Sequence, residues 1–437
     1  MMIRYTLILI ITISTILFLA NWNQIGFTQG SYEHFIYSTE KLYTKIKNKI
    51  EKFFFKKKAQ KAIEESWEAM HEDDLKFALK KKIPNWFTDQ INDDFSFITT
   101  SKPIKLDSYK FTEQYIINNK IGGIARVKII NNKIYYKIYY QNKGYDDRYD
   151  YIFSAILKAG KYVKFPDVDF FICTKDSFKQ KYPETSAPIF AFAINKNLRA
   201  NKILIPDALT LMDSKLSDEI RKINNEIPWD SKIDKAFWRG STTGWIDGSD
   251  DSDPEITIEN YSKFPRFKLV EISEQYQELL DAKFVNFVHM NEATKNYIAT
   301  KFALAPSANK LAHLSYKIQI NIDGNSSTYP GFLWRLLSNS VVLKQETEDM
   351  QWFYNFVKPM IHYVPVKSDL SDLIEKIHWI KSHDQEAKII AENATKFVNE
   401  NLTIADIHLY IYILLKNYSQ IIDFQPEIDA SYIEFKI

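Results

Sequence analysis

The segment from Tyr316 to Lys367 constrains the fold of this chain more than any other. It reads YKIQINIDGNSSTYPGFLWRLLSNSVVLKQ and, a few residues later, WFYNFVKPMIHYVPVK. Apolar runs of strand length alternate there with a polar turn and a stretch of helix length, which is typical of strands joined by crossover helices. The segment therefore predicts half of a nucleotide-binding α/β domain, with strands at Tyr316–Ile322, Val341–Lys344 and His362–Val366.

A second informative segment, KAFWRGSTTG, lies upstream at Lys235–Gly244. Its short apolar strand is expected to deliver Trp238 and Arg239 into a turn. That turn would consist of Gly240, Ser241, Thr242, Thr243 and Gly244. Backbone N–H groups left free by such a turn, with an arginine beside them, favour the binding of a diphosphate.

Further strands are predicted before this segment. A hairpin is expected over Ile124–Tyr140, turning at Asn131 and Asn132, which tolerate positive φ. Buried strands are expected at Asp169–Cys173, Ile189–Ala193 and Ile203–Ile205. Two alternating α/β sets in one chain predict two Rossmann-like domains that face a cleft.

Composition limits the function classes. The chain has 437 residues, of which 45% are hydrophobic, enough for two domains with large cores. The formal net charge of +2 gives no reason to expect a nucleic acid partner. Cys173 is the single cysteine, so no disulfide forms within the chain, and a buried thiol is expected.

The first residues predict a membrane segment. Tyr5–Ala20 carries no charge and follows Arg4, which favours a single-pass N-terminal anchor over 1–22. A cleaved signal peptide is the alternative, although Phe18-Leu19-Ala20 matches its cleavage pattern poorly. The lysines of Lys41–Lys61 favour a cytoplasmic location for the body of the protein.

Taken together, the quoted segments resemble glycosyltransferase family 90, which includes Rumi-like protein O-glucosyltransferases, capsule-associated xylosyltransferases and lipopolysaccharide-core glycosyltransferases. FPDVDFFICTKD, KAFWRGS, YKIQINIDGN, LLSNSVVLKQ, HYVPVKSDLSDL and IAENATKFVNENL occur in the family's order. The resemblance spans about Phe165 to Asn401. It implies the GT-B architecture, in which a terminal helix crosses back to the first domain.

The expected organisation follows from these patterns. After the anchor come a helical, lysine-rich extension (23–95) and an N-terminal α/β domain on the acceptor side (96–228). A C-terminal α/β domain on the nucleotide-sugar side (229–400) and the returning segment (401–437) complete the chain. A helix capped by Asp369 is expected within the C-terminal domain. Trp352, Phe353 and Tyr354 are expected in the core rather than at a sugar.

Transfer of a sugar from a nucleotide requires a base for the acceptor hydroxyl, and a carboxylate suits this task. Asp167, Asp169 and Asp176 lie in FPDVDFFICTKD. Asp167 and Asp169 lead into a strand, which argues against a metal-binding DxD loop. Asp176 follows that strand, where α/β sheets bind ligands. The resemblance implies that Asp176 is the base, whereas a helix N-cap is the structural alternative.

The resemblance also implies how the donor is held. Arg239 occupies the family's Arg-Gly-Ser position, with Trp238, Gly240, Ser241 and Thr243 around it. Asp323, Gly324 and Ser326 form a second loop with N–H and hydroxyl donors. Many members carry an arginine where this chain has Gly331. Arg335, one helical turn later, is expected to take its place.

These features predict an inverting glycosyltransferase that uses a UDP-sugar and needs no metal or other cofactor. The acceptor would be a glycan or a lipid-linked saccharide of lipopolysaccharide, capsule or glycoprotein type, near a membrane. No histidine set has metal-ligand spacing. The alternative is a non-catalytic, membrane-tethered sugar- or nucleotide-binding protein.

Overall fold

The computed structural model describes residues 72–80, 82–140, 147–178, 181–212, 214–244, 255–306, 308 and 310–436. All of them belong to one compact unit that spans 63–437. The predicted anchor at 1–22, most of the extension at 23–95 and the acidic stretch Asp247–Asp253 lie outside the described residues. Among the residues that are described, no helix is both long and apolar enough to cross a membrane.

The elements form two α/β sets. The first contains α4 (Glu72–Lys80), α5 (Asn85–Ser96), α6 (Leu106–Asn118), β1 (Ile124–Ile130), β2 (Lys133–Ile138), α7 (Arg148–Gly160), β3 (Val168–Cys173), β4 (Ile189–Ala191), β5 (Ile194–Asn195), β6 (Lys202–Leu204), α8 (Ala208–Met212) and α9 (Ser214–Glu226). The second contains β7 (Ile233–Ser241), α10 (Pro265–Gln275), β8 (Leu280–Asn286), α11 (Glu292–Lys301), β9 (Tyr316–Asn321), α12 (Gly331–Leu336), β10 (Val341–Gln345), β11 (Asp349–Met350), β12 (Val364–Val366), α13 (Leu373–Ser382) and α14 (Asp384–Asn401). Two C-terminal elements follow, α15 (Ile404–Ser419) and β13 (Ile433–Phe435).

The first set builds a six-stranded sheet in the order β13-β2-β1-β3-β4-β6. β1 and β2 form the predicted hairpin, and Asn131 and Asn132 at its turn have φ values of 52° and 61°. β3, β4 and β6 pair in parallel. Every residue of β3 is buried, as expected for a strand covered on both faces.

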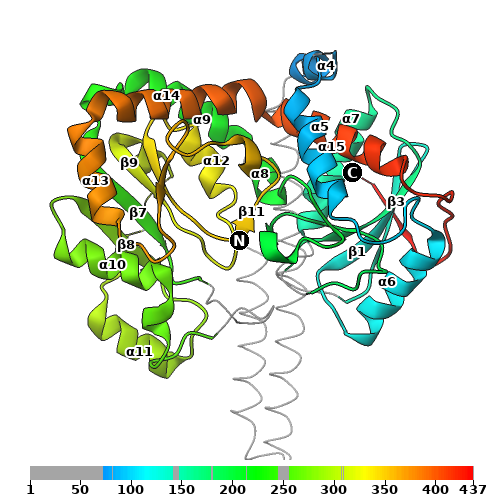
Figure 1. Ribbon diagram of the computed structural model, residues 1–437, viewed down its shortest axis with the longest axis horizontal. Helices are drawn as coiled ribbons and strands as arrows, with labels where there is room; N and C mark the ends of the chain where they lie inside the picture. Colours follow the sequence, from blue (N-terminus) through cyan, green and yellow to red (C-terminus); the bar gives the residue numbers. More distant parts are fainter. Residues whose placement is uncertain are drawn as a thin grey trace, which may run out of the picture. The chain divides into compact units, whose positions relative to one another are not determined.

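The second set builds a parallel five-stranded sheet in the order β12-β10-β9-β7-β8. β8 was not predicted. The chain runs outward from β7 to β8 and then returns to β9 on the other side of β7. The strand order therefore reverses between β7 and β9, and such a reversal is where doubly wound sheets bind ligands. Figure 1 shows the strands of this sheet among α10, α12, α13 and α14.

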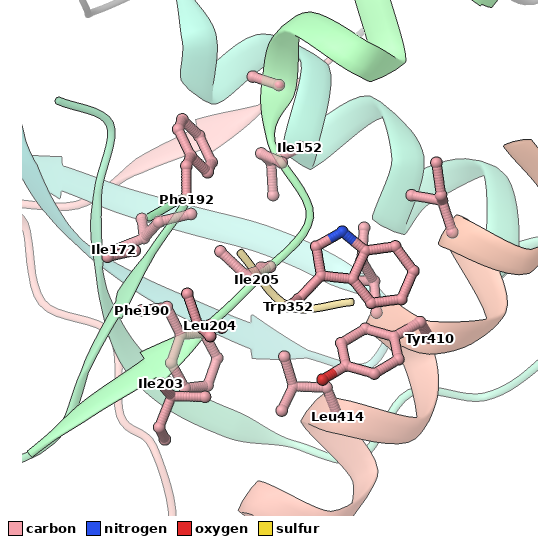
Figure 2. Packing of buried hydrophobic residues seen from close by; sticks show 14 of the residues in the cluster. Ile152, Ile172, Phe190, Phe192, Ile203, Leu204, Ile205, Trp352, Tyr410 and Leu414 are labelled. Atoms are coloured by element: carbon pink, nitrogen blue, oxygen red, sulfur yellow. The ribbon is translucent and has the colours of Figure 1, made fainter. Parts of the chain in front are cut away.

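Two hydrophobic cores hold the elements. The larger core combines β3, β4 and β6 with α15, and it also includes Trp352 and Phe353 of the second set. Figure 2 shows the ring of Trp352 beside Tyr410, and their ring centroids are 4.3 Å apart. This placement confirms Trp352 and Phe353 as core residues.

The C-terminal segment packs on the first set. α15 begins with a capping box between Thr403 and Asp406. The helix contacts α4, α5, α7 and β3. β13 then adds to the edge of the first sheet by pairing with β2.

Two local predictions were wrong. The turn expected from Gly240 does not start there, because β7 continues to Ser241 and pairs with β8 as far as Asn286. Gly240 is instead required by the ring of Trp238, which a side chain at 240 would overlap. The helix expected to be capped by Asp369 begins at Leu373, because Leu370 has a positive φ of 60°.

Candidate functional site

A cavity of about 1130 Å³ lies at the carboxyl edge of the parallel sheet. Its wall includes Asp323 and Gly324 after β9, Lys344 at the end of β10 and Lys367 after β12. Pro265 at the start of α10 also lines it. Ligands of parallel α/β sheets bind at this edge, and the volume is ample for a nucleotide sugar.

The loop at 323–326 links this cavity to the first α/β set. The carboxylate of Asp323 accepts hydrogen bonds from Thr328, through both N–H (3.1 Å) and hydroxyl (3.0 Å), and from the Thr347 hydroxyl (2.6 Å). The Gly324 N–H donates to the Ser326 carbonyl at 3.0 Å. These hydrogen bonds hold Asp323 and Gly324 in the cavity wall, whereas Asn325 and Ser326 at the other end of the loop are not among the lining residues.

Ser326 and Asn325, at that other end, reach Asp176. The Ser326 hydroxyl donates to the Asp176 carbonyl at 2.7 Å, and the Asn325 amide lies 3.3 Å from Asp176 Oδ2. Tyr329 donates to the same carbonyl at 2.7 Å and lies 3.3 Å from Oδ1. Two predicted site residues from distant segments, Asp176 and Ser326, are thus brought together.

A fourth group orients the Asp176 carboxylate. Arg148, at the start of α7, places Nη1 2.8 Å from Asp176 Oδ1 and 2.9 Å from the carbonyl of Thr174. Neither Arg148 nor Tyr329 was predicted. The sequence offered no signal for Arg148, because its partner lies 28 residues away in a loop after another strand.

The other two carboxylates of FPDVDFFICTKD are held elsewhere. Asp169 lies in β3 and accepts three hydrogen bonds from Arg126, at 2.8 to 3.2 Å. Burial raises the pKa of Asp169 even though Arg126 lowers it. Asp167 accepts the N–H of Asn131 at 2.9 Å, which ties it to the hairpin turn. Of the three candidates, Asp176 is the one that lies beside the loop at 323–326.

Arg239 is engaged within the sheet. Its Nη1 donates to the carbonyls of Trp238 (2.8 Å) and Asp281 (2.9 Å), and its Nη2 forms an ion pair with Asp281 Oδ2 at 2.7 Å. Trp238 points to the opposite face of β7 and is buried in the second core. Neither residue lines the cavity.

Arg266, which was not predicted, joins the ends of β7 and β9. Its guanidinium donates to the carbonyls of Ser241 (3.0 Å), Ile322 (3.3 Å) and Asp323 (3.0 Å), and also to the Thr243 hydroxyl. Burial lowers its pKa to about 10. A Cβ at Gly324 would lie 2.8 Å from Arg266 Nη2 and 2.9 Å from Thr243 Oγ1, so a larger residue there would displace this crossing. Arg266 thereby brings Ser241, Thr243, Asp323 and Gly324 together at the strand-order reversal.

Arg335 differs from the other arginines of the site. Its side chain is 5% exposed, and its Nε has no hydrogen-bond partner. Across the described ranges no carboxylate forms an ion pair with it. Burial, with the neighbouring Arg266, lowers its pKa to about 9. A buried cation without an anion is costly, so this position is suited to an anionic ligand. Like Arg239, Arg335 is not among the residues that line the cavity, although Phe332 on the same helix is.

Tyr354 packs against the larger core, as expected, and one side of it also lines the cavity. Within the described part of the chain, no group of three His, Cys, Asp or Glu side chains is placed to hold a metal ion.

A mixed α/β fold with a nucleotide-sized cavity at a strand-order reversal defines a class of ligand-binding α/β proteins. Comparison with known sequences identifies the family. The sequence profile of glycosyl transferase family 90 matches residues 87–250 and 257–436, more than half of the chain. The chain therefore belongs to glycosyl transferase family 90, as its motifs indicated.

Several curated relatives are similar. Protein O-glucosyltransferase 2 of Danio rerio is 28% identical over 348 residues, covering 78% of this chain and 63% of the relative. Protein O-glucosyltransferase 3 of Rattus norvegicus is 29% identical, covering 68% of this chain and 55% of the relative. The chain thus spans somewhat over half the length of these relatives. A crystal structure of Anabaena Alr3699/HepE with UDP-glucose has 12% identity and a TM-score of 0.34, covering 53% of this chain and 64% of that protein.

Proposed function

We propose that the chain is an inverting, metal-independent glycosyltransferase of GT-B architecture that moves a hexose or pentose from a UDP-sugar to a hydroxyl of its acceptor. The loop at 323–326 carries this proposal. One end of the loop forms the wall of a nucleotide-sized cavity, and the other end contacts the carboxylate expected to act as base. Membership of a glycosyltransferase family supports the same reaction.

In the proposed reaction the acceptor O–H bond breaks and its proton passes to Asp176. The acceptor oxygen forms a bond to the anomeric carbon as the bond from that carbon to the diphosphate breaks. UDP leaves with the bonding electron pair. The negative charge that develops on the diphosphate requires a cation, and Arg335 is the buried arginine whose charge is not compensated. The loop N–H and hydroxyl groups near Thr243 and Gly324 complete this site.

The names of the relatives favour transfer of glucose to a protein hydroxyl. A glycan or lipid-linked saccharide near a membrane is the acceptor class that the bacterial branch of the family would favour. A membrane anchor at 1–22 with a cytoplasmic catalytic domain remains part of the proposal.

The test uses the full chain. UDP, UDP-glucose, UDP-galactose and UDP-xylose are titrated with and without EDTA, and UDP release is followed with protein and saccharide acceptors. We expect UDP binding that is unchanged by EDTA, together with UDP release from at least one donor. Binding without release from any donor would indicate the non-catalytic alternative. Binding lost in EDTA and restored by Mn²⁺ would show that a metal is required.

A further inference from the structure

We propose that Arg148 is a positioning residue for the base, holding the Asp176 carboxylate so that one oxygen is directed to the acceptor. This proposal rests on the proposed function. It adds a residue that neither the sequence motifs nor the family pattern pointed to. The geometry that supports it lies entirely within the described residues.

The two oxygens of the carboxylate are in different environments. Oδ1 accepts hydrogen bonds from Arg148 Nη1 at 2.8 Å and from the Tyr329 hydroxyl at 3.3 Å. Oδ2 receives the neutral amide of Asn325 at 3.3 Å, a long and weak contact. An acceptor hydroxyl can replace this amide at much lower cost than it can replace a charge-assisted bond. Oδ2 is therefore the oxygen that would take the proton.

The position of Arg148 is itself fixed. The same Nη1 donates to the carbonyl of Thr174 at 2.9 Å, two residues before Asp176. The side chain of Arg148 is 15% exposed and that of Asp176 is 28% exposed. Such a partly buried pair is screened less by solvent than a surface pair. The guanidinium thus ties α7 to the loop that carries the base.

The charges around the pair determine what its loss would do. Arg148 forms an ion pair with Asp176. Its charge also partly offsets the rise that burial causes in the pKa of Asp207. Among the described residues, Tyr329 from the loop before α12 is a second titratable group in contact with Asp176, and burial raises its pKa well above the usual value. Within the described ranges, Arg148 is the cation that forms an ion pair with the Asp176 carboxylate. Removing it favours the protonated form, which cannot act as a base.

The experiment compares Arg148→Met, Arg148→Lys and a matched control, Arg221→Met, in the full chain. Arg221 forms an ion pair of the same length, 2.8 Å, with Asp218 on α9. The pH dependence of UDP release and the affinity for UDP are measured for each variant. In parallel, the ¹³C titration of the Asp176 carboxyl is followed, with its signal assigned by comparison with Asp176→Asn.

We expect Arg148→Met to move the acidic limb of the rate profile, and the carboxyl titration, upward by about 1 to 2 pH units. UDP affinity should stay within about twofold of the unsubstituted chain. Arg148→Lys should restore part of the shift, and Arg221→Met should cause none. A rate lowered equally at every pH, or an unchanged carboxyl titration, would overturn the proposal. If no donor releases UDP, the proposed function fails, and the carboxyl titration alone decides whether Arg148 controls Asp176.

Discussion

The guanidinium of Arg335 occupies the space that a side chain at Gly331 would need. A Cβ built at Gly331 would lie 2.7 Å from Arg335 Nη1, closer than such atoms approach in proteins. Many family members have an arginine at the position of Gly331. In this chain the glycine and Arg335, four residues later on α12, form a complementary pair. We therefore expect Arg335 to supply the charge that the family resemblance placed at residue 331.

Arg335→Met is expected to separate stability from binding. Removing a buried, unpaired charge should raise the melting temperature of the free protein by about 2 °C or more. Loss of a charge-assisted contact should weaken UDP binding by about tenfold or more. Thermal unfolding and calorimetric titration with UDP would measure the two effects. A variant that melts lower and binds UDP normally would show that the role of Arg335 is structural.

Gly331→Ala should displace both Thr328 and Arg335, because the added methyl group would overlap Thr328 Cγ2 and would lie 2.7 Å from Arg335 Nη1. We expect a lower melting temperature and weaker UDP binding together. Gly160→Ala is the matched control, since a Cβ at Gly160 would make ordinary contacts of 3.7 Å with Asn132. Equal behaviour of the two alanine variants would contradict the pairing of Gly331 with Arg335.

Asp176→Asn should leave UDP affinity nearly unchanged and reduce transfer by about 100-fold or more, the usual scale for a general base. Asparagine keeps the shape of the side chain but cannot accept the proton. Asp167→Asn serves as control, because Asp167 contacts the hairpin turn rather than the loop at 323–326. Normal turnover by the Asp176→Asn enzyme would remove Asp176 as the base.

Arg239→Ala is expected to act mainly on stability. Arg239 forms an ion pair with the Asp281 carboxylate and donates to the carbonyls of Trp238, in its own strand, and Asp281, in β8. Its loss should therefore lower the melting temperature by several degrees. UDP affinity should fall less than in Arg335→Met. Asp281→Asn should reproduce the stability change if the ion pair is responsible. A larger loss of UDP affinity in Arg239→Ala than in Arg335→Met would instead support the diphosphate role predicted for Arg239.

His313 should make stability depend on pH. Burial, followed by the charge of Arg335, lowers the pKa of His313 to about 3. As the pH falls, His313 therefore binds a proton in the unfolded chain before it does so in the folded chain. This contribution to stability is complete above pH about 6.5 and is lost progressively between about 6.5 and 3, by up to about 1.4 kcal/mol per pH unit. The melting temperature is measured at pH 7.5 and at pH 5.0 for His313→Gln and for a control, His378→Gln, which replaces an exposed histidine. The difference between the two melting temperatures should be smaller for His313→Gln than for the control.

Local patterns were enough to predict much of the fold. The Asn131–Asn132 pair predicted a hairpin because asparagine tolerates positive φ, which a two-residue turn needs. The apolar run Val341–Leu343 predicted a buried strand, and all five residues of β10 are buried, including the polar Lys344 and Gln345. β8 was missed even though its buried and partly exposed residues alternate with the period of a strand.

The sequence alone determined the α/β class, the family and the placement of Asp176 after a buried strand, because these depend on periodicity and on motifs within short segments. Only the tertiary structure decided how the arginines are used. Arg239 pairs with Asp281, 42 residues away, whereas Arg266 joins the ends of β7 and β9. Arg148 reaches Asp176, and no carboxylate in the described part of the chain forms an ion pair with Arg335, whose Nε has no hydrogen-bond partner there. An arginine is charged in every context, so its role depends on which acceptor the folded chain brings within hydrogen-bond distance, and that acceptor comes from a distant segment.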